Sequence, residues 1–475
     1  MLGEQILMRQ NSYISLMLIP ILMCISVLIW YSQSIVLGSI YSLFIVTLFY
    51  FVETRKKIDF FSPFMFVSFL FVIGFFLRPL VLYFFLGDFY RPDWGFNYQE
   101  FITYSLRAIL VAQIGYLCFL YGYQIVIKSN NSHARPLISR YTNKSELLIY
   151  AFWLSVLGFS AYFVYVLLSG YSYIEFLKQN VSIDKSGKYL LFAASWLFVL
   201  GNLPLLDYAR RVKKKLVYLV YLSHFSMSCL VCVSFHDRKW LVFFLISIAI
   251  YFNYFHKKLS KKTVLFMGII LFLLLMGMLI LRNALYGYSA SADVEVQSVD
   301  SAFFIYQLFM GGMFGYFDYF AFVLNAFEKL DIMPMYGVKF FLLSFLPSGL
   351  FEFEKPVPIS QWIVSTQWGL TYSARAPGIT VFGEFFVFGG YAGVMVGMFL
   401  LGVFFRNIYE TLTRAPMTIA RLLLYVLFFQ SYFIVIRSMF LPATTHFIMT
   451  ICMLIVVFFF VKITMLKSNG SLVNR

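Results

Sequence analysis

The sequence predicts an all-α polytopic membrane protein with about twelve transmembrane helices and one large extracytoplasmic loop between helices 9 and 10. Three observations predict this class. Of the 475 residues, 61% are hydrophobic and only 12% are charged, whereas a soluble domain is about half apolar and about a quarter charged. The apolar residues occur in runs of about 20, which is the length that crosses a bilayer as a helix. Basic residues gather in every second connection between these runs, which indicates the topology.

The first apolar run extends from Tyr13 to Tyr31 and follows Arg9. It is longer than the apolar core of a usual signal peptide, and no small-residue cleavage site follows it. We therefore expect it to be the first transmembrane helix, with its N-terminal end in the cytoplasm.

The remaining runs divide the chain into three parts. We expect a bundle of nine helices in residues 1–281, a large extracytoplasmic loop in residues 282–377, and three helices with a cytoplasmic tail in residues 378–475. The expected crossings are residues 13–31, 34–52, 60–87, 102–127, 147–169, 188–209, 216–235, 241–256, 263–281, 378–405, 417–436 and 447–463.

The distribution of basic residues agrees with this topology. About 23 of the 37 Lys and Arg residues fall on the predicted cytoplasmic side, including every short basic loop. The net charge of +16 is therefore mostly a consequence of topology, and we do not expect a nucleic acid as a partner.

The large loop is too apolar to be disordered. Two of its segments, Phe303–Phe327 and Gly337–Phe351, are apolar enough to contact lipid. They could add two crossings, for a total of fourteen, or form interfacial or re-entrant helices. We prefer the second arrangement because Asp318 and the glycines around Gly311 would be unfavourable in lipid, whereas irregular backbone is tolerated beside a protein cavity.

Basic residues on the outer side are the first candidates for function, because the positive-inside rule predicts few of them there. They are Arg78, Arg91, Arg107, Arg238, Lys239, Arg282, Arg375 and Arg437. Several guanidinium groups at one depth repel each other unless an anion lies between them, and Arg binds phosphate oxygens in a bidentate manner. A pyrophosphate at the outer leaflet would satisfy this arrangement. Alternatively, each side chain reaches the membrane surface or pairs with an acid.

Two acidic residues are the candidate catalytic groups. Glu384 lies one to two turns inside the tenth crossing, where a carboxylate either pairs with an arginine such as Arg375 or Arg437 or acts as a general base. Asp318 is the next candidate base, and its alternative is a position at an aqueous interface.

Aromatic residues in the large loop are candidates for sugar binding, because sugars present apolar C–H faces to aromatic rings. They are Trp362, Trp368 and Tyr372, with Tyr306 and Tyr316. The alternative is the ordinary aromatic belt at the membrane surface. The five histidines form no HExxH motif, and no P-loop or paired Asp motif is present, so the sequence predicts neither a metal nor a cofactor.

The chain resembles the Wzy-type oligosaccharide repeat-unit polymerases, which include the O-antigen polymerases. The resemblance covers the whole chain in hydropathy and is more specific over residues 345–393. Arg238 and Arg437 are similar to arginines at equivalent topological places in that family. The matching passage consists of Phe345-Leu-Pro347, Trp362, Arg375-Ala-Pro377-Gly378, Gly383-Glu384-Phe385 and Phe388-Gly389-Gly390-x-x-Gly393.

The resemblance implies a metal-independent glycosyltransferase in the bacterial inner membrane, with both termini cytoplasmic and the large loop periplasmic. It would transfer a growing glycan from undecaprenyl pyrophosphate to the non-reducing end of a new lipid-linked repeat unit. Arg78, Arg238, Arg282, Arg375 and Arg437 would bind substrate, and Glu384 or Asp318 would be the base. Membrane lipids, a chain-length regulator and a flippase are the candidate partners.

Three other functions remain open. A flippase for the lipid-linked repeat unit would have a similar number of crossings, although flippases usually have shorter loops. An O-antigen ligase would need a loop histidine, and none lies in residues 282–377. A membrane O-acyltransferase would need a catalytic histidine, for which His224 is the intramembrane candidate.

Overall fold

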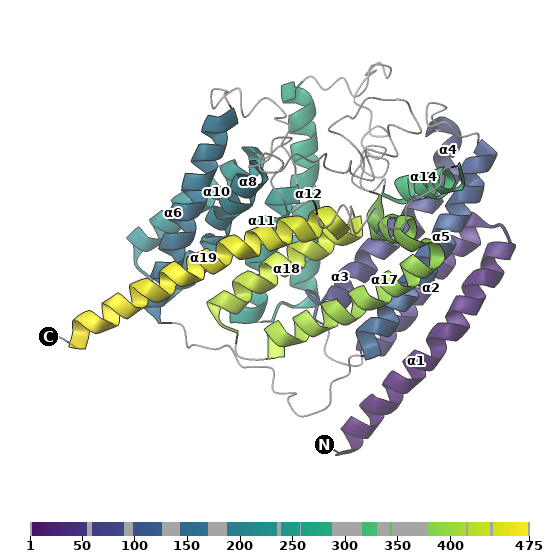
Figure 1. Ribbon diagram of the computed structural model, residues 1–475, viewed down its shortest axis with the longest axis horizontal. Coiled ribbons are helices and arrows are strands. Elements are labelled where there is room, and N and C mark those ends of the chain that lie inside the picture. Colours follow the sequence, from purple (N-terminus) through teal and green to yellow (C-terminus); the bar gives the residue numbers. More distant parts are fainter. Residues whose placement is uncertain are drawn as a thin grey trace. The chain divides into compact units, whose positions relative to one another are not determined.

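The computed structural model describes twelve stretches of the chain, and its described part is helical with short connections (Figure 1). The described residues are 2–54, 59–89, 98–125, 143–169, 188–234, 239–256, 258–286, 316–329, 343, 379–414, 417–437 and 440–473. Several of the helices carry apolar side chains on their outer surface, such as Leu216, whose side chain is 72% exposed. Apolar residues facing outward are the pattern of a helical protein embedded in a membrane, as predicted.

Seven helices in the described part are long and apolar enough to cross a membrane. They are Pro63–Phe84, Ile102–Ile125, Lys144–Leu168, Lys215–Ser234, Thr380–Thr413, Ile419–Ile436 and His446–Leu466. Shorter apolar helices occupy Met17–Tyr31, Ile35–Phe51 and Trp240–His256. Each of these ten helices coincides with a crossing expected from the sequence, so the polytopic helical class is confirmed.

The chain forms two compact units. Unit 1 is drawn from residues 1–131, 298–411 and 431–444, and unit 2 from residues 132–297, 412–430 and 445–475. These units group residues by contact, whereas the division at residues 281 and 377 groups them by topology, so that division stays a prediction.

Unit 1 contains the helices that carry the candidate site. They are α1 (Leu2–Tyr31), α2 (Ile35–Thr54), α3 (Pro63–Val72), the π-helix η1 (Ile73–Leu77), α4 (Arg78–Phe89), α5 (Tyr98–Ile125), α14 (Tyr316–Lys329) and most of α17 (Thr380–Arg414). Helices α1, α2, η1 and α14 pack together with α4 and α5. The expected crossing 60–87 is therefore one continuous helical path with a π-turn in its middle.

Unit 2 contains the helices that follow in the middle of the chain and the greater parts of the last two. They are α6 (Lys144–Ser169), α8 (Lys188–Leu200), α9 (Asn202–Val212), α10 (Lys215–Ser234), α11 (Lys239–Tyr251), η3 (Phe252–His256), α12 (Lys261–Tyr286), α18 (Ile419–Arg437) and α19 (Phe440–Val473). The expected crossing 188–209 comprises α8 and α9, which meet at Gly201. Helical hydrogen bonds from the Gly201 N–H to the Leu197 carbonyl and from the Leu205 N–H to the Gly201 carbonyl continue across this position.

Helices α5 and α17 pack closely in unit 1 because glycines let their backbones approach. A Cβ atom on Gly122 would lie 2.1 Å from the Phe399 carbonyl oxygen, and one on Gly402 would lie 2.2 Å from the Phe119 carbonyl oxygen. Small residues serve the same purpose at many helix contacts in membranes. Further toward the N-termini, a Cβ on Gly115 would meet the Val394 side chain. The two helices therefore run in the same direction, as the alternating topology predicts for the fourth and tenth crossings.

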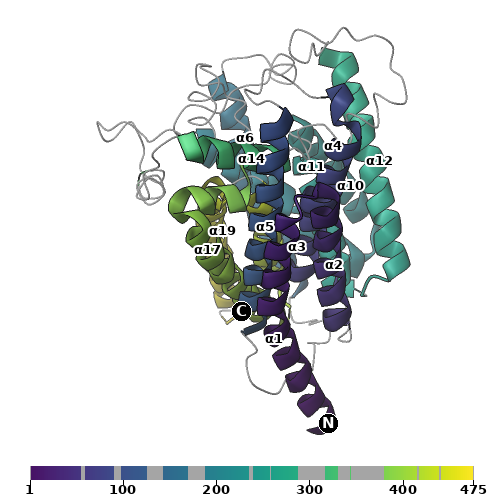
Figure 2. The same cartoon turned by 90° about the vertical axis from the view of Figure 1, so that its right-hand side faces the viewer.

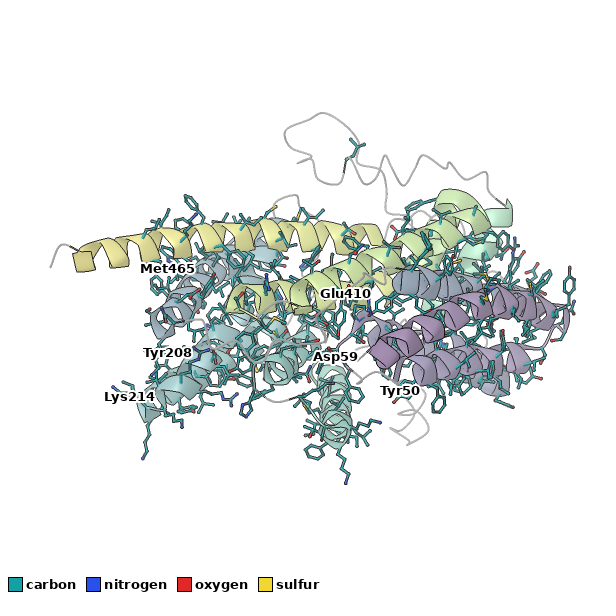
Figure 3. All side chains as sticks on the ribbon, turned by 90° about the horizontal axis from the view of Figure 1, so that it is seen from below. Tyr50, Asp59, Tyr208, Lys214, Glu410 and Met465 are labelled. Atoms are coloured by element: carbon teal, nitrogen blue, oxygen red, sulfur yellow. The ribbon has the colours of Figure 1, made fainter. Side chains whose placement is uncertain are left out.

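The end of α17 contacts the connection that follows α2 in unit 1. Figure 3 labels Tyr50 of α2, Asp59 in that connection, and Glu410 of α17. The Tyr409 hydroxyl donates a hydrogen bond of 2.7 Å to the Asp59 carboxylate, which joins the connection after α2 to the end of α17. The sequence assigns both positions to the cytoplasmic side, and the structure brings them together.

Adding a methyl group to the α5–α17 contact is expected to destabilise the protein. Gly402→Ala places a Cβ against the backbone of α5 and should cost about 1–3 kcal/mol of stability. Gly268→Ala in α12 is the matched control, because no atom lies within 4 Å of its Cβ position. The measurement is the thermal denaturation of the detergent-solubilised variants. Equal Tm values for the two variants would contradict the close contact.

Candidate functional site

A buried ion pair between Arg78 and Asp318 is the centre of the candidate site. The Arg78 Nε donates to Asp318 Oδ1 at 3.1 Å, and Nη2 forms a second hydrogen bond to Oδ2. The two residues are only 4% and 2% exposed. A fork-like arginine pairing with both carboxylate oxygens is among the strongest charge-assisted contacts in proteins. Asp318 is therefore not a residue at an aqueous interface but half of a buried pair.

Local sequence explains why Arg78 lies at this place in its helix. Proline lacks an N–H group and clashes with the carbonyl four residues earlier, so Pro79 disturbs the regular turn before it. The turn before Pro79 is the π-helix η1, in which the Arg78 N–H donates to the Ile73 carbonyl. Such π-turns often occur at functional sites in helices.

Helix α14 brings Asp318 to Arg78 from the large loop. Figures 1 and 2 both show α14 lying across α5 rather than along it. Its residues Phe317 and Phe320 are fully buried and contact Phe75 edge-on, with ring centroids 5.8 and 6.3 Å apart. This described part of the loop therefore packs against the bundle. The expectation of a re-entrant or interfacial helix stays a prediction.

Glu384 lies on a helix that packs against α14. It is 1% exposed in the first turns of α17. A Cβ on the preceding Gly383 would lie 3.3 Å from the Phe320 ring, and Phe382 contacts both Phe75 and Phe320. The aromatic side chains thus join the three helices that carry Arg78, Asp318 and Glu384. We call these three residues the buried charge cluster.

The start of α17 is fixed by Thr380, which is buried and has a φ of +64°. The Thr380 Oγ1 accepts a hydrogen bond of 3.1 Å from the Gly383 N–H, as an N-terminal helix cap does. A left-handed backbone is uncommon for a β-branched residue and is often found where function constrains the chain.

Helix α17 is broken just after Glu384. Gly389 and Gly390 have non-helical backbone angles, and Gly390 has a φ of +59°. The two parts of the helix fold against each other, because a Cβ on Gly393 would lie 2.3 Å from the Phe385 carbonyl oxygen and one on Gly397 would lie 2.5 Å from the Phe385 ring. Irregular backbone of this kind occurs in membrane proteins where it is enclosed by protein or lines a cavity.

A second arginine of the expected outer set contacts the broken helix. The Arg107 Nε donates a hydrogen bond of 2.6 Å to the Tyr391 hydroxyl, and its guanidinium lies 5.5 Å from the centre of the Tyr391 ring. Tyr391 directly follows the break and is 43% exposed. Arg107 is therefore held beside the break and close to the protein surface.

The other predicted site residues are only partly described. Arg282 lies in α12 and Arg437 ends α18, but the positions of their side chains are not described. Arg238, Arg375, Trp362, Trp368 and Tyr372, together with Arg91 and Tyr306, lie outside the described residues. Their proposed roles remain predictions. No group of three or more potential metal ligands occurs among the described residues.

Sequence reasoning missed three residues of this region. Thr380 and Tyr391 lie next to the Gly383-Glu384 and Gly389-Gly390 pairs, so their proximity to these motifs was a usable signal. Asn325 is fully buried on α14 with no hydrogen-bond partner for either carboxamide atom. Nothing in its sequence neighbourhood distinguishes it from an ordinary surface asparagine.

Comparison of the chain with family models, with curated proteins and with solved structures finds no match.

Removing one charge of the buried pair is expected to be strongly destabilising. Asp318→Asn leaves the Arg78 charge without its carboxylate and should cost about 3–5 kcal/mol of stability. The double variant Arg78→Met with Asp318→Leu should recover most of that loss, because apolar side chains can replace a buried pair. Thermal denaturation in detergent measures both effects, with Lys262→Met on the exposed start of α12 as the control. A wild-type Tm for Asp318→Asn would contradict this role.

The break in α17 is expected to tolerate a side chain at one glycine but not at the other. Gly390→Ala forces alanine into a left-handed conformation and should cost about 1–3 kcal/mol. Gly389→Ala is the control, because its φ of −164° suits any residue and its Cβ position is free of contacts. The Tm values of the two variants measure the difference. Equal, raised Tm values would contradict the break, because in a continuous helix both alanines would be favourable.

Proposed function

We propose that the protein polymerises lipid-linked oligosaccharide repeat units into a surface polysaccharide. The observation that carries the proposal is the buried charge cluster, in which the large loop supplies Asp318 to Arg78 beside the helix that carries Glu384. Buried ionisable residues at membrane depth usually serve substrates, ions or protons. Glu384 also lies within the passage that resembles the Wzy-type polymerases.

The proposed reaction requires a base and an anion-binding group. A hydroxyl oxygen on the non-reducing sugar of the acceptor forms a bond to the anomeric carbon of the donor glycan. The bond from that carbon to pyrophosphate breaks, and undecaprenyl pyrophosphate leaves. Glu384 accepts the proton of the attacking hydroxyl, as a positioned carboxylate does in general base catalysis. Positively charged groups stabilise the negative charge that develops on the pyrophosphate.

The residues divide these roles according to their surroundings. Both oxygens of Asp318 already accept hydrogen bonds from Arg78. The pair therefore suits a role in positioning α14, which packs against the helix that carries Glu384. Arg238, Arg282, Arg375 and Arg437 are the proposed partners of the pyrophosphate. Trp362, Trp368 and Tyr372 are the proposed sugar-stacking residues.

The proposed setting follows from the substrate and the charge pattern. The distribution of basic residues supports cytoplasmic termini and a large loop on the opposite side of the membrane. The resemblance to the Wzy-type polymerases implies that this membrane is a bacterial inner membrane and that the loop is periplasmic. The proposed partners are undecaprenyl-pyrophosphate-linked oligosaccharide and membrane lipids, with a flippase that delivers the substrate and a chain-length regulator. No metal or other cofactor takes part in the proposed reaction.

Replacing the proposed base is expected to abolish polymerisation. In a strain that lacks the gene, Glu384→Gln should leave surface lipid capped with a single repeat unit, whereas the wild-type gene restores long chains. Glu410→Gln is the matched control, because Glu410 is also a buried glutamate on α17 but pairs with Arg406. The measurement is gel analysis of surface glycan from cells with equal amounts of each protein.

The same experiment separates the proposal from its alternatives. Loss of the gene removes only the long chains if the protein is a polymerase, but it removes every extracytoplasmic repeat unit if the protein is a flippase. A ligase defect would leave long chains on their carrier lipid instead of on the surface. Long chains made at the wild-type level by Glu384→Gln would reject Glu384 as the base.

A further inference from the structure

Asn325 is a buried polar residue that the protein itself does not satisfy. It is 0% exposed on α14, and neither its carboxamide nitrogen nor its oxygen has a hydrogen-bond partner in the described part of the chain. Buried polar groups are nearly always hydrogen-bonded, and one without a partner calls for a specific explanation such as a ligand or an ordered water. Leaving both ends of a carboxamide unpaired lowers the stability of the folded protein. This cost indicates that Asn325 has a functional role, such as binding a ligand.

The position of Asn325 connects it to the buried charge cluster. It lies seven residues after Asp318, which places both residues on one face of α14 about 10 Å apart along the helix. Helix α14 packs against α5, where the Ser105 hydroxyl is also buried and has no hydrogen-bond partner among the described residues. Two packed helices therefore each carry a buried polar group with unused hydrogen-bonding capacity.

We propose that Asn325 binds the sugars of the substrate. A carboxamide offers two N–H donors and a carbonyl acceptor. A sugar hydroxyl or an acetamido group can both donate and accept, so either group satisfies both ends of Asn325. A phosphate at pH 7 mainly accepts hydrogen bonds and would leave the Asn325 oxygen unpaired, and a polyprenyl chain would satisfy neither end. The chemistry therefore indicates a neutral, hydroxyl-rich ligand.

This inference rests on the proposed function. It assigns two parts of the substrate to two regions of the site. The charged groups serve the pyrophosphate and the reacting hydroxyl, and Asn325 holds a sugar further along α14. The separation of about 10 Å along the helix fits an oligosaccharide that extends beyond the reacting sugar. Asn325 is thus a specificity-determining residue rather than a catalytic one.

Asn325→Leu tests the inference because a loss of folding cannot imitate the expected result. Leucine has a similar size and no unpaired polar atoms, so the Tm of the purified variant should rise by about 2 °C or more. In the deletion strain, the same variant should make about tenfold fewer long glycan chains than wild type at equal protein amount. Gln124→Leu is the matched control, because the Gln124 carboxamide oxygen is also buried without a partner. Gln124 adjoins Tyr123, which contacts Arg406 near the opposite end of α17 from Glu384.

A direct binding measurement completes the test. The probe is the repeat-unit oligosaccharide released by mild acid from the surface polysaccharide of the source cells. It should raise the Tm of wild type and of Gln124→Leu but not that of Asn325→Leu. A raised Tm with wild-type chain lengths and wild-type oligosaccharide binding would mean that Asn325 holds only water, and this result would overturn the inference. A lowered Tm would overturn it as well, because the carboxamide would then have partners within the protein.

Failure of the inference and failure of the proposed function give different results. If deletion of the gene leaves the glycan ladder unchanged, the polymerase proposal fails whatever the variants do. If deletion removes the long chains and Asn325→Leu restores them fully, the polymerase proposal stands and the assignment of Asn325 fails.

Discussion

The ion pair between Arg78 and Asp318 constrains the rest of unit 1. A guanidinium group inside a membrane protein is unfavourable unless a carboxylate accompanies it, and a buried carboxylate is equally unfavourable alone. Each residue therefore requires the other, although they lie 240 residues apart. The pair draws α14 from the large loop to the middle of the third crossing. The edge-on contacts of Phe317 and Phe320 with Phe75 then pack the apolar side chains of α14 against η1.

A second constraint acts on the backbone of α17. A helix that crosses a membrane normally keeps every N–H and C=O group bonded within itself, because lipid offers no alternative partners. The break at Gly389 and Gly390 departs from this rule, and the packing of Phe385 over Gly393 and Gly397 stabilises the resulting bend. The short first part of the helix, which carries Glu384, is thereby set at its own orientation beside α14. The broken backbone of α17 and the buried carboxylate of Glu384 therefore occur in the same part of one helix.

The proposed function brings these features into one site with two kinds of chemistry. Charged groups suit a reaction in which a proton is removed and a pyrophosphate departs. The neutral carboxamide of Asn325 suits a sugar, because it can donate and accept hydrogen bonds together. A polymerase for lipid-linked glycans needs both, since its substrate combines an anionic linkage with a neutral oligosaccharide. The two unpaired carboxamide atoms of Asn325 lower the stability of the folded protein. Such a loss of stability is expected for a residue that is retained for ligand binding.

The sequence by itself determined the helical membrane class and the approximate bounds of ten described crossings. Both follow from local properties, because an apolar run of about 20 residues partitions into the bilayer wherever it occurs in the chain. It also predicted that Asp318 and Glu384 were unusual, since carboxylates are rare at such places. Only the tertiary structure decided that Asp318 pairs with Arg78, that α14 lies across α5, and that α17 is broken at Gly389 and Gly390. These features depend on contacts between distant segments, and no local pattern specifies which distant partner a buried charge or a broken helix will meet.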